Sequence, residues 1–195
     1  RRRADEIIKE NRVTINDIVA KVGDSVNEGD LVKLDGELMI VEREKVHYVL
    51  NKPTGVLSAV IDTSGRKLVV DFIDEKKRIF PVGRLDYDSE GLIILTNDGE
   101  IYNKIIHPSS EIFKTYEVIV DGEVKRNEIL ILERGIDLDD YITLPSIIDE
   151  VKILQNDDLR CNTFIRIKIR EGKNRQIRKM FKRLGYEVIN LKRTS

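Results

Sequence analysis

The sequence is poor in cysteine and histidine. It contains one cysteine, Cys161, and two histidines in 195 residues. A lone cysteine cannot form an internal disulfide, which fits a reducing compartment. These three side chains are also too few for an ordinary zinc site, whose four ligands are mostly cysteine and histidine. We therefore expect a cytoplasmic protein that binds no metal.

Long apolar runs are absent too. The longest, such as residues 92–95, fall far short of the roughly 20 residues that a membrane-spanning helix requires. Charged residues make up 35% of the chain, which also argues against a membrane protein, while 41% hydrophobic residues suffice for a buried core. The opening Arg1-Arg2-Arg3 does not resemble a signal peptide. At this length we expect one main domain and a small one.

Charge is nearly balanced overall but unevenly distributed. The formal net charge is -1, yet residues 166–183 are strongly basic and are opposed there only by Glu171. The basic residues in this stripe are Arg166, Lys168, Arg170, Lys173, Arg175, Arg178, Lys179, Lys182 and Arg183. Because salt screens charges beyond roughly 8–10 Å, a local basic stripe attracts phosphate whatever the total charge. An ordinary solvated face is the alternative, and composition leaves both open.

The first 40 residues have the pattern of a small α/β module. Apolar residues have helical spacing over 4–8. Short strands are expected at 13–15, 31–34 and 37–41. Tight turns are indicated at Asn16-Asp17 and at Asp35-Gly36, the second a strong hairpin signal. Residues 42–45 are charged throughout and are interpreted as a linker.

The remainder, from about residue 46, predicts an α+β fold with a mixed, largely antiparallel sheet and helices packed on it. Strands are expected at 46–50, 92–96, 115–120, 151–155 and 163–170, and helices at 67–73, 100–106, 126–134 and 174–184. The clearest strand places Ile165, Ile167 and Ile169 on one face. In the last helix, Ile177, Met180, Phe181 and Leu184 form the stripe expected to be buried.

The most informative stretch is residues 83–99, GRLDYDSEGLIILTNDG. A polar loop between two glycines is followed by an apolar strand and an Asn-Asp-Gly turn. Such a loop places Asp86 at the edge of a rigid sheet, where a reactive carboxylate is well positioned. Spacing alone favours the simpler interpretation, that Asp86 is a turn or capping residue.

Four motifs, in order, resemble the RsuA/RluB branch of the RNA pseudouridine synthases. They are residues 50–55 (LNKPTG), 83–99, 114–118 (KTYEV) and 171–181 (EGKNRQIRKMF). Within the branch, the similarity is greatest to the type B enzymes of large-subunit (23S) ribosomal RNA. The opening segment resembles the end of an S4 RNA-binding module. The resemblance therefore implies a partial S4 domain over 1–42 and a catalytic domain over 43–195, whose C-terminus we expect to be truncated.

The resemblance also implies the roles of three residues. Asp86 corresponds to the catalytic aspartate, which either attacks the nucleotide or removes a sugar proton and must be ionised for both. Tyr116 corresponds to the active-site tyrosine, which stacks on the flipped uracil and could accept its C5 proton. Arg178 corresponds to the basic residue that pairs with the aspartate, since a guanidinium can hold a carboxylate with two hydrogen bonds.

Further basic residues near the motifs are candidates for phosphate contacts around the flipped nucleotide. These candidate RNA-binding residues are Lys52, Arg84, Lys114, Lys173 and Arg175. The family's reaction needs neither cofactor nor metal, so we expect none. The expected partner is structured ribosomal RNA, and the expected oligomeric state is a monomer.

Three functions remain to be compared. The first is isomerisation of a specific uridine to pseudouridine in bacterial 23S ribosomal RNA, or the same chemistry on 16S ribosomal RNA or a tRNA. The second is RNA binding without catalysis by an S4-type protein. The third is a hydrolase, which needs two catalytic carboxylates flanking the scissile bond. Asp88 and Glu90 lie near Asp86, but neither is as strong a candidate for a catalytic carboxylate as Asp86.

Overall fold

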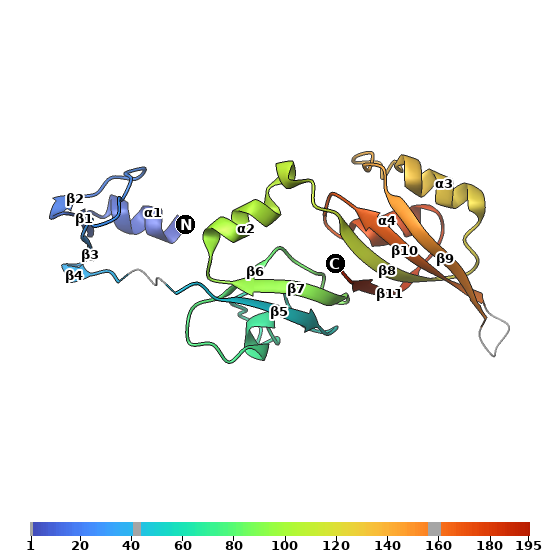
Figure 1. The fold of residues 1–195 in the computed structure, drawn as a ribbon, viewed down its shortest axis with the longest axis horizontal. Helices are drawn as coiled ribbons and strands as arrows, with labels where there is room; N and C mark the ends of the chain where they lie inside the picture. The colour runs from blue at the N-terminus through green and yellow to red at the C-terminus, as the bar shows by residue number, and fades with distance from the viewer. Residues whose placement is uncertain (1, 41–43, 156–160) are drawn as a thin grey trace. The chain divides into compact units, whose positions relative to one another are not determined.

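The structure, a computed structural model, describes residues 2–40, 44–155 and 161–195. The chain forms two compact units, Arg1–Glu44 and Lys45–Ser195 (Figure 1). The predicted boundary between residues 42 and 43 lies outside the described residues, as does part of the predicted linker.

The first unit is a helix followed by a small antiparallel sheet. Helix α1 (Arg2–Lys9) precedes β1 (Val13–Ile15), β2 (Ile18–Val19), β3 (Val32–Leu34) and β4 (Glu37–Leu38), in the sheet order β2-β1-β3-β4. Asn16 and Asp17 have φ of 51° and 66°, and Asp35 and Gly36 have φ of 51° and 87°. Two successive left-handed residues make the hairpin turn whose twist matches the strands. Both predicted turns are confirmed, whereas the assignment to an S4 module stays a prediction.

The second unit is built on a seven-stranded sheet. Its strands are β5 (His47–Lys52), β6 (Phe80–Val82), β7 (Glu90–Thr96), β8 (Lys114–Asp121), β9 (Ile147–Gln155), β10 (Cys161–Ile169) and β11 (Val188–Arg193). They lie in the order β5-β7-β11-β8-β10-β9, and β6 pairs with β7 beside this path (Figure 1). Paired strands are antiparallel except β7 and β11, which are parallel. The predicted α+β fold with a largely antiparallel sheet is confirmed.

The helices of this unit are short. They are α2 (Gly99–Ile106), α3 (Arg126–Arg134) and α4 (Gln176–Arg183), with 3₁₀ turns η1 (Val69–Phe72) and η2 (Pro108–Ser110). The helix predicted at 67–73 is wrong: only η1 forms there, because Leu57 forms a bridge with Leu68 and its carbonyl accepts from Val69 N. No helix in the described part of the chain is long and apolar enough to cross a membrane.

Two strands of this unit were not predicted from the sequence, and neither was β2 of the first unit. β6 contains Pro81, and proline within a run argues against a strand because it lacks an N–H. β11 has a register shift between Val188 and Asn190, which breaks the two-residue period on which strand prediction depends. β11 lies at the centre of the sheet, so its absence from the prediction concealed how the halves of the sheet join.

The core lies on one face of the sheet. Ile165, Ile167 and Ile169 of β10 are buried, which confirms the predicted alternation of that strand. Ile177, Met180 and Phe181 of α4 are buried in the same cluster, and Leu184 packs against it half-buried, which confirms the predicted stripe. Each such side chain contributes roughly 1.5–3 kcal/mol when fully buried.

Candidate active site

A row of directly paired residues, one from each of four neighbouring strands, crosses the sheet beside the site. The strand register pairs Lys52 of β5 with Gly91 of β7. The row continues through Arg193 of β11 to Tyr116 of β8. Side chains of directly paired residues project to the same face of a sheet. Since the adjacent row holds apolar residues such as Ile93, this row marks the point where the core gives way to polar groups.

Gly91 allows the two halves of the sheet to meet in that row. Its φ is +110°, and a Cβ there would lie 2.1 Å from the Arg193 carbonyl oxygen, which is sterically impossible. β7 and β11 are paired only at Glu90–Lys192 and Gly91–Arg193. This short parallel contact joins the β5–β7 half to the β8–β11 half.

A cleft of about 830 Å³ borders the row. Its lining includes the predicted site residues Arg84, Asp86, Tyr116, Lys173 and Arg175. The loop of residues 83–89, which we call the catalytic loop after the role predicted for Asp86, supplies the first two. The segment before α4 supplies the basic pair. Residues separated by about 90 positions in the sequence therefore meet in one cleft, of the size expected for a small-molecule or nucleotide site.

The catalytic loop is held by its backbone on both sides of Asp86. Ser58 Oγ donates to the Leu85 carbonyl at 2.9 Å and accepts from Leu85 N at 3.0 Å. Gly55 N donates to the Tyr87 carbonyl at 2.8 Å. Among the described residues, the half-buried carboxylate of Asp86 forms no salt bridge and accepts no side-chain hydrogen bond, so its oxygens stay available to a substrate.

Tyr116 is almost fully buried, at 8% exposure, and its ring lines the cleft. Burial raises the pKa of its phenol, and the negative charge of Asp86 acts in the same direction. The nearby positive charge of Arg193 opposes this shift but does not cancel it. The Tyr116 hydroxyl therefore keeps its proton at neutral pH and is close enough to Asp86 to sense its charge.

Lys52 does not reach the surface, so its predicted contact with RNA phosphate is wrong. The side chain has 0% exposure, and its ammonium donates to the Pro53 carbonyl at 2.9 Å. Burial lowers its pKa, while the carboxylates of Asp88, Asp86 and Glu90 partly restore it. β5 alternates inward and outward, and its last position points inward beneath the catalytic loop. Lys52 therefore supplies positive charge below the carboxylates.

Arg178 contacts Asp88, which differs from the predicted pairing with Asp86. Its guanidinium donates to the Asp88 carbonyl at 2.9 Å and to the Val188 carbonyl at 3.1 Å, and its Nε lies 3.3 Å from Asp88 Oδ2. Arg175 donates to both oxygens of the same carboxylate, at 3.1 and 2.8 Å. This hydrogen bonding, followed by the charges of both arginines, lowers the pKa of Asp88. Arg178 thus fixes the end of the catalytic loop.

The comparison with protein families identifies the family of the chain that forms this cleft. The model of the family described as RNA pseudouridylate synthase matches residues 46–183, which include Lys52, Gly91 and Tyr116 of the row and the catalytic loop. The chain belongs to the RNA pseudouridylate synthase family. The resemblance found in the sequence motifs is confirmed, and the binding-only and hydrolase alternatives give way to a synthase.

Individual relatives agree with this assignment. The synthase is 45% identical over 195 residues to the ribosomal large subunit pseudouridine synthase B of Bacillus subtilis (strain 168), covering 99% of this chain and 78% of the relative. It is 39% identical to the dual-specificity RNA pseudouridine synthase RluF of Escherichia coli (strain K12), covering 100% and 64%. A crystal structure of a pseudouridylate synthase matches with a TM-score of 0.64 and 29% identity, covering 98% and 80%.

The basic stripe of the synthase is largely neutralised by acids from elsewhere in the chain. The pairs are Arg166 with Glu117 and Glu150, Lys168 with Asp149, Arg170 with Glu111, Arg175 and Arg178 with Asp88, Lys179 with Asp140, and Arg183 with Asp139. Of the two alternatives left open for the stripe, a solvated face paired with acids therefore describes most of it. Charge inside residues 166–183 looked unopposed only because the opposing acids lie on other strands and loops.

The remaining predicted basic residues of the synthase differ in their surroundings. Arg84 and Lys173 are exposed at the cleft, and Lys173 Nζ lies 3.3 Å from the centre of the Tyr141 ring, a cation–π contact that fixes the ammonium. Lys114 does not line the cleft: its ammonium donates to the Arg170 carbonyl at 3.2 Å. Burial and the nearby charge of Arg193 lower the Lys114 pKa.

Three residues near the site were missed by the sequence analysis. Ser58 holds the backbone of Leu85, and Asp88 receives Arg178 at the end of the catalytic loop. Arg193 is the strand partner of Tyr116 and donates to the Leu92 carbonyl. The available signal for Arg193 was its alternation with Leu191, which places an arginine on an inward face. No comparable signal marks Ser58, because its partner is backbone.

Proposed function

We propose that this synthase converts a uridine of bacterial large-subunit (23S) ribosomal RNA to pseudouridine, with Asp86 as the catalytic carboxylate. The observation that carries the proposal is that Asp86 and Tyr116 share one cleft with Arg84 and Lys173. Substrate choice is supported by the 45% identity to an enzyme named for the large ribosomal subunit. We further propose that it acts in the cytoplasm as a monomer without cofactor or metal.

The proposed reaction breaks the bond between uracil N1 and ribose C1′, turns the base, and forms a bond from C1′ to C5. The C5 proton is lost and N1 gains a proton, so the product has the mass of the substrate. To reach Asp86 the uridine must leave its stack, at a cost of a few kcal/mol. Arg84 and Lys173 at the cleft offer cations to the phosphates of the displaced nucleotide.

The raised pKa of Tyr116 supports a narrower role for this residue. A phenol that stays protonated at neutral pH is suited to stack on the base and donate a hydrogen bond. It is poorly suited to accept the C5 proton. We therefore assign Tyr116 to holding the uracil while it turns, rather than to proton removal.

A hydrolase is not favoured by the surroundings of the other loop carboxylates. Asp88 is held by Arg175 and Arg178, and Glu90 accepts a hydrogen bond from Asn190 at 3.3 Å. Neither is placed like the second catalytic carboxylate that glycosidic hydrolysis requires.

The decisive experiment treats unmodified 23S and 16S transcripts with the protein and its Asp86→Asn variant. Pseudouridine is mapped by carbodiimide adducts and primer extension. One strong stop on 23S RNA that disappears with the variant is the expected result. A stop on 16S RNA alone would retain the enzyme and overturn the substrate. Product RNA of reduced mass would instead indicate base release.

A further inference from the structure

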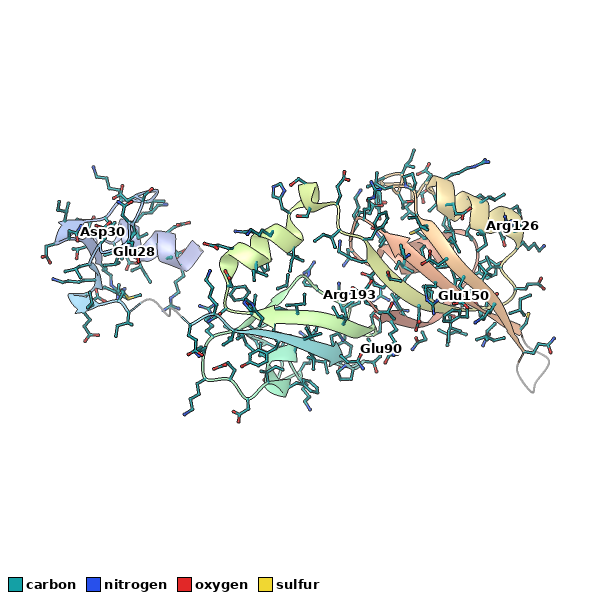
Figure 2. The ribbon with its side chains drawn as sticks, viewed as in Figure 1. Glu28, Asp30, Glu90, Arg126, Glu150 and Arg193 are labelled. Atoms are coloured by element: carbon teal, nitrogen blue, oxygen red, sulfur yellow. The ribbon has the colours of Figure 1, made fainter. Side chains whose placement is uncertain are left out.

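Tyr87 directly follows Asp86 and lies near the opening of the cleft. It is 49% exposed although it lines the cleft, whereas Tyr116 in the same cleft is 8% exposed. The catalytic loop that carries Tyr87 runs directly into β7, whose first residue, Glu90, is labelled in Figure 2. The cleft therefore offers two phenol rings at different depths, Tyr116 in its buried part and Tyr87 near its opening.

The backbone and the hydroxyl of Tyr87 are both held against one turn. The Tyr87 carbonyl accepts a hydrogen bond from Gly55 N at 2.8 Å. A Cβ built on Gly55 would lie 3.8 Å from the Tyr87 hydroxyl oxygen, so the tip of the phenol lies over the open side of this glycine. Gly55 has a φ of +75°, a conformation that residues with a Cβ rarely adopt. The ring is thus fixed at both ends without being buried.

The exposed ring of Tyr87 is suited to binding a nucleobase rather than to stabilising the fold. Tyr87 belongs neither to the buried core cluster nor to the half-buried residues packed against it. In single-stranded RNA, unstacked bases are recognised by stacking on exposed aromatic side chains. A ring that is already fixed also loses little rotamer freedom when a base stacks on it. Tyr87 therefore presents a preformed aromatic surface one residue from Asp86.

We propose that Tyr87 stacks on the base of a nucleotide adjacent to the target uridine. The proposal rests on the function proposed above, because it takes the flipped uracil to lie at Asp86 and Tyr116. Flipping deprives the neighbouring base of a stacking partner, and the Tyr87 ring replaces that partner. The neighbour is thereby held at the opening while the uridine occupies the buried part of the cleft. Stacking depends on the π-face, so Tyr87→Phe should bind RNA within about twofold of the wild type.

A thermodynamic cycle between protein and RNA tests the stack. Affinities are measured in the Asp86→Asn background, which separates binding from turnover, with the RNA that the wild type modifies. We expect Tyr87→Leu to weaken binding roughly 5- to 100-fold, the range for loss of one base–aromatic stack. With an abasic nucleotide at one neighbour of the uridine, the same substitution should cost less than about twofold. An equal loss with every abasic RNA, or no loss with intact RNA, would overturn the proposal.

A fluorescent reporter at position 87 gives a second readout. The chain contains no tryptophan, so Tyr87→Trp introduces a single one that keeps a π-face for stacking. Because a stacked base quenches indole emission, its fluorescence should fall with intact RNA and change little with the RNA that lacks the stacked base. Phe72→Trp is the control, since Phe72 is 37% exposed but does not line the cleft. Equal changes for the two reporters would contradict the proposal.

Failure of the proposed function would be recognised separately from failure of the stack. A wild type that modifies neither 23S nor 16S transcripts would overturn the proposed function. The Tyr87→Trp reporter would then be titrated with a short single-stranded RNA in which adenines flank one uridine. Quenching by this RNA and not by its abasic form would retain Tyr87 as a base-stacking residue, and equal responses would refute the stack as well. If Tyr87→Leu does not fold, the two tryptophan reporters decide the result.

Discussion

Asp88 receives two parallel hydrogen bonds from Arg175, at 3.1 Å to Oδ1 and 2.8 Å to Oδ2. This two-pronged contact joins the catalytic loop to the segment that begins α4. Arg175 has a left-handed φ of 50°, a conformation that costs energy for a side chain with a Cβ. The ion pair offsets that cost and fixes the entry to the helix.

Replacing Asp88 should therefore impair catalysis without removing RNA binding. In Asp88→Asn the two parallel charge-assisted hydrogen bonds are lost and the loop that carries Asp86 is less well fixed. We expect kcat to fall roughly tenfold, while RNA affinity is retained or increased because Arg175 is released. Single-turnover kinetics and filter binding measure the two quantities. Glu150→Gln, which weakens a surface pair with Arg166, is the control, and an unchanged rate in Asp88→Asn would contradict the role.

Acid stability should depend on the same carboxylate. Arg175 and Arg178 hold the Asp88 pKa below its ordinary 3.8. A lowered carboxyl pKa contributes stability that is present above the unfolded-state pKa and is lost as pH falls through the folded-state pKa. As pH falls below about 4, the wild type should lose more stability than Asp88→Asn. Urea unfolding across that range would detect this, and parallel curves would contradict it.

Replacing Lys52 should have opposite effects on thermal stability and on catalytic activity. Its pKa is lowered overall, so burial costs the ammonium more than the nearby carboxylates return. Lys52→Met, of similar volume, should raise the melting temperature at neutral pH but lower kcat by at least roughly tenfold, since charge below Asp86 is lost. The unfolded chain binds the proton more tightly, so wild-type stability should rise relative to the variant as pH rises through the lowered pKa toward 10.5. A variant that is both less stable and fully active would refute this account.

Ser58 should influence activity through the backbone of Leu85. Ser58→Ala leaves a buried N–H and carbonyl without their partner, which should destabilise the fold by about 1–3 kcal/mol and lower kcat more than it raises KM. Ser58→Thr keeps the hydroxyl and should restore most of the activity. Ser64→Ala, in an exposed part of the same loop, should behave as wild type. Equal activity of the alanine and threonine variants would exclude a positioning role for the hydroxyl.

RNA affinity should depend on the cleft cation Lys173 more than on paired cations of the stripe. Lys173→Met should weaken binding and reduce the slope of log affinity against log salt by about one. Lys168→Met removes a cation already paired with Asp149 and should leave that slope nearly unchanged. Titrations at several salt concentrations compare the two. Equal slopes for both variants would indicate that paired cations of the stripe contact RNA as strongly as Lys173 does.

The sequence predicted those parts of the fold that depend on local pattern. The alternation of Ile165, Ile167 and Ile169 and the stripe of α4 were assigned correctly because each depends on neighbours within the same element. The Asp86 loop was located by its flanking glycines and by the family resemblance.

What could not be predicted depends on pairing between distant strands. The burial of Lys52 follows from where β5 lies in the sheet, and the contact of Arg193 with Leu92 spans about 100 residues. The acidic partners of the basic stripe could not be predicted for the same reason, since Arg166 meets Glu117 and Glu150 only when three strands are in register. Residue spacing along one segment carries no information about such registers.

The parallel contact between β7 and β11 has a consequence for heat inactivation. Asp86 belongs to one half of the sheet and Tyr116 to the other, and only two residue pairs of this contact join the halves along the strands. A slight shear between the halves would separate carboxylate from phenol while every hairpin stayed intact. On warming, turnover should therefore cease several degrees before circular dichroism records any loss of secondary structure.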